Sequence, residues 1–141
     1  MYHASKYGMS AMAEALAVEC RPFGIRVTTL EPGMVDTGFP RATRPTGAAV
    51  RGEGPYQPLL VDLRAGFGEW RRRFPTPPEV VAQAVLAAAE ATDGPFRVPV
   101  GDDAVHLTGL REGASDDEQW QDDLAGFLLL DWPRRPGQPP G

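Results

Sequence analysis

Residues 2–33 read YHASKYGMSAMAEALAVECRPFGIRVTTLEPG, and this stretch decides the fold. Its first part, residues 2–20, is rich in Ala and Met and repeats apolar residues at spacings of four, three and four, the periodicity of an α-helix. The repeat consists of Met9, Ala13, Leu16 and Cys20. Pro22 and Gly24 end this helix, because proline cannot continue the hydrogen-bond ladder and glycine accepts a left-handed backbone.

A run rich in β-branched residues follows the helix and predicts a strand over residues 25–31. Pro32 and Gly33 end the strand. A strand that follows a helix within a few residues is typical of an α/β unit, so we expect this part of the chain to build one.

Turn-forming residues dominate from 33 to 75, but one amphipathic helix interrupts them. Apolar residues recur there at spacings of four, four, three and four, at Leu59, Leu63, Phe67, Trp70 and Phe74. Gly66 and Gly68 each weaken such a helix by roughly 1 kcal/mol relative to Ala, so we expect packing to hold it. The segment 38–75 is a candidate mobile lid.

A further helix and strand follow this segment. Residues 76–79, TPPE, supply an N-cap, a proline at the first helical position and an acidic capping-box residue, so a helix is predicted over residues 77–92. Alternating apolar residues over 96–100 predict a short strand, and Pro99 favours an edge position. A helix between two strands predicts parallel pairing through a right-handed crossover.

The C-terminal part is expected to be helical. Residues 115–118, SDDE, form another capping box, and an apolar stripe follows it. The stripe comprises Trp120, Leu124, Phe127 and Leu128. We therefore assign residues 105–132 to a helical extension, and the Pro- and Gly-rich residues 133–141 to a disordered tail.

These elements amount to an α/β fold with about two strands and four helices. Sheets of fewer than about three strands are rarely stable without further cover. We therefore expect residues 1–104 to be a partial domain. Either another chain supplies the rest of the sheet, or the N-terminal part of the domain is missing from this sequence.

The composition excludes several classes of protein. Of the 141 residues, 42% are hydrophobic and 23% are charged, which fits one globular domain rather than a disordered or fibrous chain. The net charge of −5 argues against bulk attraction to nucleic acid or anionic lipid. No run of about 18 apolar residues exists to span a bilayer, and no secretory signal pattern is present. We expect a cytoplasmic protein whose partners are small molecules or other proteins.

The sequence offers little for a metal site. Cys20 is the only cysteine, so no intrachain disulfide and no cysteine-based metal cluster can form. His3 and His106 are isolated histidines with no second ligand near them in the sequence. We expect no bound metal.

Tyr2 and Lys6 are four residues apart in the first turns of the first predicted helix, so their side chains project from one face and can reach a common substrate. An ammonium a few Å from a phenol favours the tyrosinate, and the positive end of the helix dipole acts in the same direction. The pair therefore suits proton transfer, and the remaining lysine donors suit sugar hydroxyls. Taken alone, a Tyr-x-x-x-Lys spacing is more often plain helix surface.

Four runs of sequence set this pair in context: YHASKYGM at 2–9, AEALAVE at 13–19, FGIRVT at 23–28 and EPGMVDT at 31–37. Together they closely resemble the short-chain dehydrogenase/reductase family. The resemblance implies an active-site helix, the next parallel strand and the loop that closes over the nicotinamide, which form the C-terminal portion of a Rossmann-like doubly wound sheet. It is dense to residue 39 and looser up to residue 100.

The resemblance implies an oxidoreductase that moves a hydride between NAD or NADP and an alcohol or carbonyl substrate. Tyr2 would be the catalytic acid/base that passes a proton to or from the substrate oxygen. Lys6 would favour the tyrosinate and bind the nicotinamide ribose hydroxyls.

The turn after the strand would hold the nicotinamide. By resemblance, Pro32 and Gly33 would shape the turn, and the main chain of Val35 would bond the carboxamide. Thr37 would contact the carboxamide or the pyrophosphate. The segment 38–74 would cover the substrate, and its Leu, Phe and Trp side chains favour an apolar one.

The family's glycine-rich phosphate loop and catalytic serine precede the tyrosine, whereas only Met1 precedes Tyr2 here. Two later glycine pairs, at 52–54 and 66–68, do not complete a Gly-x-Gly-x-x-Gly pattern, because Gln57 and Arg71 stand where the third glycine belongs. We therefore expect the chain alone neither to bind NAD(P)H tightly nor to turn over substrate.

A non-catalytic interaction module is the alternative. In the family, the helix that carries the tyrosine and lysine also packs in subunit interfaces. The face with Met9, Ala13 and Leu16 would then dock on a second copy of the chain or on another partner.

Overall fold

The computed structural model describes residues 2–38, 47, 51–128 and 130 of the chain. The chain divides into two compact units. The first unit comprises Met1–Val35 and Thr76–Val105, and the second comprises Asp36–Pro75 and His106–Gly141.

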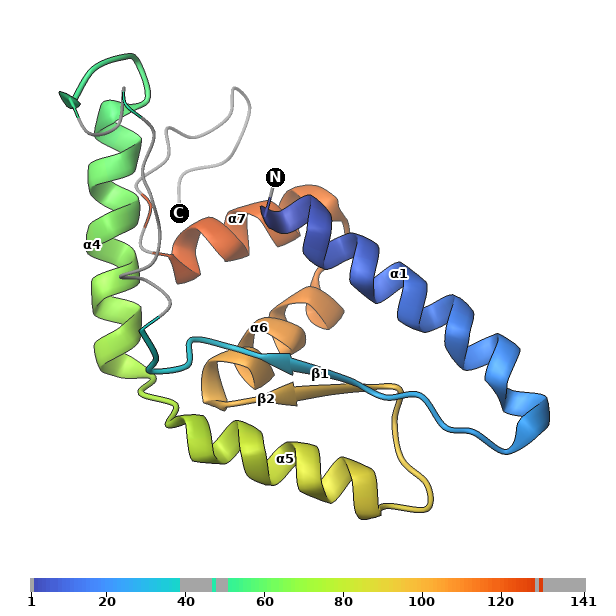
Figure 1. The fold of residues 1–141 in the computed structure, drawn as a ribbon. Helices are drawn as coiled ribbons and strands as arrows, with labels where there is room; N and C mark the ends of the chain where they lie inside the picture. The colour runs from blue at the N-terminus through green and yellow to red at the C-terminus, as the bar shows by residue number, and fades with distance from the viewer. Residues whose placement is uncertain (1, 39–46, 48–50, 129, 131–141) are drawn as a thin grey trace. The chain divides into compact units, whose positions relative to one another are not determined.

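The first unit contains a two-stranded parallel sheet (Figure 1). Strand β1 (Thr29–Pro32) pairs with β2 (Arg97–Val100), with Thr29 opposite Arg97 and Pro32 opposite Val100. The parallel pairing predicted from the sequence is confirmed. The predicted start of the first strand at residue 25 is wrong: β2 begins only at Arg97, so residues 25–28 have no partner strand in the described part of the chain.

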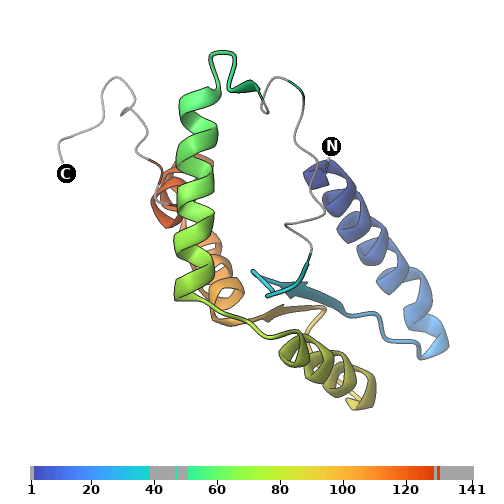
Figure 2. The ribbon, with the colours of Figure 1, turned by 60° about the vertical axis from the view of Figure 1, so that its left-hand side comes forward.

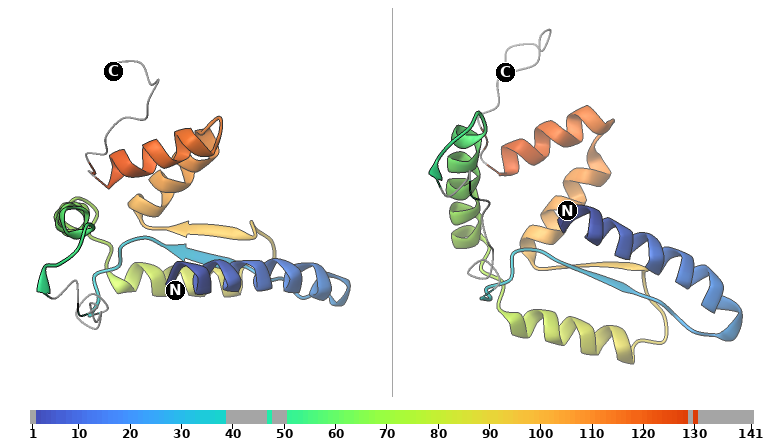
Figure 3. Two further views of the ribbon diagram at one scale, coloured as in Figure 1. Left: turned by 90° about the horizontal axis from the view of Figure 1, so that it is seen from above. Right: turned by 45° about the horizontal axis from the view of Figure 1, so that its top comes forward.

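Helix α1 (Tyr2–Cys20) ends as the sequence predicts. A 3-10 turn, η1 (Arg21–Phe23), follows it, and Gly24 takes the left-handed conformation with φ of 71°. That φ favours glycine, because any Cβ would be strained there. The chain then reverses, so α1 runs antiparallel to β1 (Figures 1 and 3).

One arginine joins α1 to the sheet. The Arg97 guanidinium on β2 donates to Glu31 of β1 at 2.6 Å and to Glu14 of α1 at 3.2 Å. Its hydrogen bond to Glu31, aided by Glu14, raises the pKa of Arg97. α1 buries none of its residues completely, so this polar link is a notable contact between the helix and the sheet.

Helix α5 (Pro78–Glu90) connects the two strands and lies on the same face of the sheet as α1 (Figure 3, left). Arg26 caps its C-terminal end by donating to the carbonyl oxygens of Ala88, at 2.5 Å, and Ala91, at 2.8 Å. Thr76 is not the N-cap that the sequence predicts. Pro77 holds that position without a side-chain hydrogen bond, because Thr76 is buried in a parallel bridge with Val35.

The second unit contains the helix predicted from the spaced apolar residues, α4 (Gln57–Arg73) (Figure 2). Gly66 is its buried residue, and a Cβ there would overlap the carbonyl oxygen of Leu128. Close packing thus accounts for a glycine that weakens the isolated helix. The three arginines Arg71–Arg73 occupy the last turn of α4, where a helix favours positive charge.

The C-terminal part contains α6 (Asp102–Gly113) and α7 (Asp117–Phe127). The predicted cap at Ser115 is wrong by one residue. Asp116 is the N-cap and accepts a hydrogen bond from the Gln119 amide at 2.8 Å. No cap pattern predicted the start of α6, which follows β2 after a single glycine. The predicted tail at 133–141 lies outside the described residues, as do parts of the predicted lid.

Over the part of the chain that the structure describes, no helix is both long enough and apolar enough to cross a membrane.

Candidate active site

The candidate site lies where β1 and β2 end. In open parallel α/β sheets, ligands bind at the carboxyl ends of the strands. β1 ends at Pro32 and β2 at Val100, opposite one another in the ladder, and a glycine follows each strand. Because α1 runs antiparallel to β1, its N-terminal end lies toward this edge of the sheet (Figures 1 and 3).

Tyr2 and Lys6 lie close together in the first turns of α1. The Lys6 ammonium is 5.5 Å from the centre of the Tyr2 ring. Tyr2 is 54% exposed and Lys6 is also exposed, so both side chains are accessible to a ligand. Ser5 donates from its hydroxyl to the Tyr2 carbonyl at 2.7 Å, which helps to order the start of a helix that bears no acidic residue in its first turn.

The turn after β1 is held at three successive residues. The Gly33 amide donates to the Val100 carbonyl at 3.0 Å, continuing the ladder by one step. The next amide, that of Met34, donates to the Asp103 carboxylate at 2.5 Å. Val35 then forms the parallel bridge to Thr76. Three of the residues assigned to the site from the sequence, Pro32, Gly33 and Val35, therefore follow one another through a fixed turn.

Thr37 belongs to the second unit, whereas Val35 belongs to the first. Arg71 of α4 donates to the Asp36 carboxylate at 3.1 Å and to the Thr37 carbonyl at 3.3 Å. Arg71 therefore ties the end of α4 to the segment that leaves the turn.

Three residues at the strand ends were not assigned to the site from the sequence. Asp103 is completely buried (0% exposed), and Thr76 is 5% exposed. Gly101 has φ of 98°, a conformation that favours glycine. A strand that ends in glycine, followed by two aspartates at the start of a helix, is the signal that marks this place.

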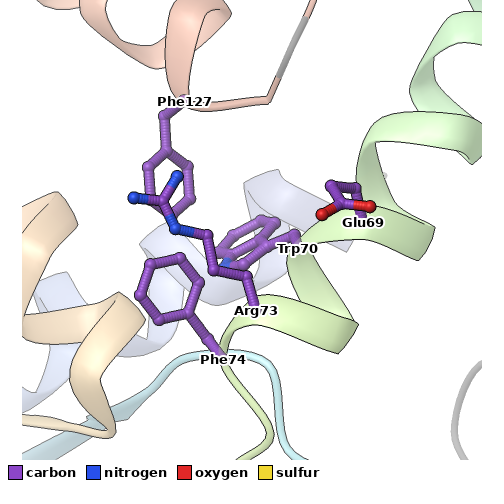
Figure 4. Close-up of a pocket in the computed structure, with 5 residues that line it drawn as sticks. All are labelled: Glu69, Trp70, Arg73, Phe74 and Phe127. Carbon is purple, nitrogen blue, oxygen red and sulfur yellow. The ribbon is translucent and has the colours of Figure 1, made fainter.

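The second unit contains a small open cavity of about 150 Å³ (Figure 4). Its lining residues are Glu69, Trp70, Arg73, Phe74 and Phe127. Phe127 of α7 meets Trp70 edge to face, with ring centres 4.6 Å apart, and stacks on Phe74 at 5.9 Å. The walls are thus mainly aromatic, and the Arg73 guanidinium lies 5.2 Å from the Phe74 ring centre.

Within the described ranges, no three His, Cys, Asp or Glu side chains are grouped so that they could hold a metal ion. The His106 ring packs beside Phe127, with ring centres 5.4 Å apart.

Comparison with known proteins identifies the family. The short chain dehydrogenase family model matches residues 1–47, which include α1, β1 and the turn after it. The chain belongs to the short-chain dehydrogenase/reductase family. The identification made from residues 2–37 is confirmed, and the parallel pair of strands with its helices is a partial Rossmann-like α/β fold.

Similarity to curated members of the short-chain dehydrogenase/reductase family extends beyond the matched segment. An uncharacterized oxidoreductase of Schizosaccharomyces pombe is 29% identical over 116 residues, which cover 82% of this chain and 47% of the relative. An oxidoreductase of Botryotinia fuckeliana is 28% identical over 123 residues, 86% of this chain and 44% of the relative. A 3-ketodihydrosphingosine reductase of Bacteroides thetaiotaomicron is 30% identical over 100 residues, 71% of this chain and 36% of the relative. The chain spans less than half the length of these relatives.

Proposed function

We propose that this chain carries the nicotinamide end of an NAD- or NADP-dependent oxidoreductase site, where a hydride moves between the cofactor and an alcohol or carbonyl substrate. The observation that supports the proposal most directly is the Tyr2–Lys6 pair. An accessible phenol and an ammonium 5.5 Å from its ring stand at the N-terminal end of α1, toward the edge where the strands end. Membership of an oxidoreductase family agrees with this chemistry.

In this proposal Tyr2 passes a proton to or from the substrate oxygen. Lys6, whose ammonium lies beside the Tyr2 ring, donates to the ribose hydroxyls. Its ammonium has neither an ion pair nor a hydrogen bond to any described residue, so its donors are open to a ligand. The bound cofactor supplies or accepts the hydride.

The turn after β1 fits the nicotinamide, because its backbone is held at Gly33, Met34 and Val35. The main chain of Val35 bonds the carboxamide in this proposal, and Thr37 contacts the carboxamide or the pyrophosphate. The 141 residues contain no Gly-x-Gly-x-x-Gly pattern, so they do not fit the phosphates of the cofactor equally well. Only the nicotinamide half is assigned to this chain.

An apolar substrate is part of the proposal. The second unit, which includes the predicted substrate-covering segment, has a cavity with mainly aromatic walls. Aromatic surfaces of this kind favour flat or aliphatic groups. The relative from Bacteroides thetaiotaomicron is named 3-ketodihydrosphingosine reductase, and a keto substrate agrees with the carbonyl group in this proposal.

The two halves of the cofactor, added as separate ligands, test the proposal by nuclear magnetic resonance. We expect nicotinamide mononucleotide at millimolar concentration to shift the amide resonances of Tyr2, Lys6 and Val35, and adenosine monophosphate to leave them in place. Lys6→Met would weaken the response, whereas Arg21→Met, which removes a positive charge just beyond the other end of α1, would not. Nicotinamide mononucleotide without effect on these three resonances would rule out the assignment.

Intact NADH and NADPH provide a second test. Fluorescence titration of the purified chain is expected to show no binding in the micromolar range, because the phosphates lack a glycine-rich cradle in this sequence. Micromolar binding would refute this expectation. In any complemented, active enzyme, Tyr2→Phe removes the proton carrier and is expected to abolish turnover.

A second candidate function is a non-catalytic interaction module that associates through α1. The helix has no completely buried residue, and large apolar side chains on it remain exposed, including Met9 at 61% and Leu16 at 48%. Light scattering of the purified chain over a range of concentrations distinguishes the two candidates. Association that Leu16→Asp disrupts and Tyr2→Phe leaves intact would favour the interaction module.

A further inference from the structure

Asp103 is a buried carboxylate at the start of α6. It is 0% exposed, and both of its oxygens accept hydrogen bonds from backbone amides. Oδ2 accepts from Met34 at 2.5 Å, across 69 residues of sequence, and Oδ1 accepts from Ala104 at 2.9 Å. The Asp103 side chain thus links the segment that follows β2 to the turn that follows β1.

A buried carboxylate is costly unless hydrogen bonds and nearby positive charge compensate for the lost water. The two amides supply charge-assisted hydrogen bonds, and the positive end of the α6 dipole lies at the carboxylate. Removing the carboxylate would leave the Met34 amide without its protein acceptor.

Two glycines make room for this side chain. A Cβ on Gly33 would overlap the Asp103 carboxylate. A Cβ on Gly101 would lie 3.0 Å from Asp103 Oδ1 and 2.7 Å from Thr76 Oγ1. The turns after both strands therefore close around one carboxylate, and neither tolerates a larger residue without movement.

Three interactions hold the turn after β1, and they are of different kinds. Gly33 bonds the Val100 carbonyl, and Val35 bridges to Thr76 through the backbone. Only Met34, between them, is held by a side chain. Because Gly33 has no Cβ, the peptide unit between Gly33 and Met34 would rotate easily if that acceptor were lost.

We infer that Asp103 is a positioning residue that sets the orientation of the Gly33–Met34 peptide and thereby the main chain of Val35. The consequence for nicotinamide rests on the proposed function, whereas the effect on the turn itself does not. The sequence separation of Asp103 from the turn makes it a long-range determinant of the site.

Amide hydrogen exchange of the full chain tests the effect on the turn. Asp103→Ala is expected to raise the exchange rate of the Met34 amide by about 10- to 100-fold relative to the Thr29 amide, which bonds to the Phe96 carbonyl and reports general opening of the sheet. Asp102→Ala is the matched control, because Asp102 is exposed in the same helical turn and its loss alters the same helix dipole.

Asp103→Asn keeps an acceptor oxygen and is expected to restore most of the protection at Met34, which a general loss of stability would not explain. It also serves as the test variant if Asp103→Ala does not fold. The rise in exchange rate is then expected to be small and to be larger at Met34 than at the other residues that anchor the turn. Equal acceleration of Met34 and Thr29, or an unchanged Met34 rate, would overturn the inference.

Binding of nicotinamide mononucleotide gives a second measurement, which a general loss of stability would not change selectively at Val35. The shift of the Val35 resonance seen with the native chain is expected to be lost in Asp103→Ala and recovered in Asp103→Asn, while the shift at Lys6 persists in both. No shift in the native chain would reject the proposed function and leave the exchange experiment to decide the role of Asp103. A full Val35 shift in Asp103→Ala would overturn the positioning role.

Discussion

At the scale of single residues, the Asp103 side chain occupies the space that a Cβ on Gly33 would need. Gly33 lacks a Cβ where one would overlap the carboxylate, and the Gly33 backbone does not adopt a positive φ. The requirement for glycine is therefore one of space and not of backbone conformation. The effect of a substitution at one of the two positions on the free energy of unfolding should therefore depend on which residue stands at the other.

A double-mutant cycle measures this dependence. Gly33→Ala alone is expected to lower the free energy of unfolding by about 1–3 kcal/mol, because the new methyl group displaces the carboxylate. In an Asp103→Gly background the same change should cost less, with a coupling of about 1–2 kcal/mol. Urea denaturation of the four proteins gives the coupling directly. Additive effects would show that the two residues are not in contact.

At the residue scale, the sequence predicted some residues of the candidate site and missed others. The sequence pointed to Tyr2, Lys6 and the turn residues as candidates because they lie within one short, recognisable run. Asp103 was not, because its partner Met34 is 69 residues away. An aspartate at the start of a helix most often caps its own helix, and no local pattern reveals that it is buried against a distant turn.

At the scale of secondary structure, helix periodicity was a better guide than end signals. The periods of α1 and α4 predicted both helices, since each follows from local spacing. The start of β1 and the cap of α5 were misplaced because tertiary pairing determined them. β1 begins where β2 offers a partner, and Thr76 is engaged with Val35 and does not cap α5.

The two glycines of α4 form a matched pair that separates helix propensity from packing. Gly68 has open space around its Cα, so Gly68→Ala should raise the free energy of unfolding by about 0.5–1 kcal/mol. Gly66 packs against the Leu128 carbonyl, so Gly66→Ala should lower it despite the same gain in propensity. Chemical denaturation of both variants checks the signs. A stabilising Gly66→Ala would show that α4 does not pack there.

At the scale of the whole molecule, the family and the fold class followed from the sequence, and the stability of the first unit did not. Its sheet has two strands in the described part of the chain, and few of its side chains are fully buried. Two residues of the apolar stripe on α1, Met9 and Leu16, are 61% and 48% exposed. How α1 is held to the sheet therefore matters for the position of Tyr2 and Lys6.

Arg97 is the polar part of that attachment, because it bonds Glu14 of α1 and Glu31 of β1 at once. All three side chains are partly exposed, so the network is worth at most about 1 kcal/mol. Arg97→Met is therefore expected to raise amide exchange in α1 by up to about fivefold while α5 changes little, and the unmodified chain should approach the same rates in 1 M salt.

The pH dependence of this attachment follows from the raised pKa of Arg97. A cation whose pKa is higher in the folded state contributes its stability at every pH below the unfolded value, and loses it only as the pH rises through the raised value. Arginine titrates far above neutrality, so exchange in α1 should show no Arg97-dependent change between about pH 6 and pH 9. A difference between the native chain and Arg97→Met that varies across this range would mean that another group controls the attachment of α1, and with it the position of the Tyr2–Lys6 pair.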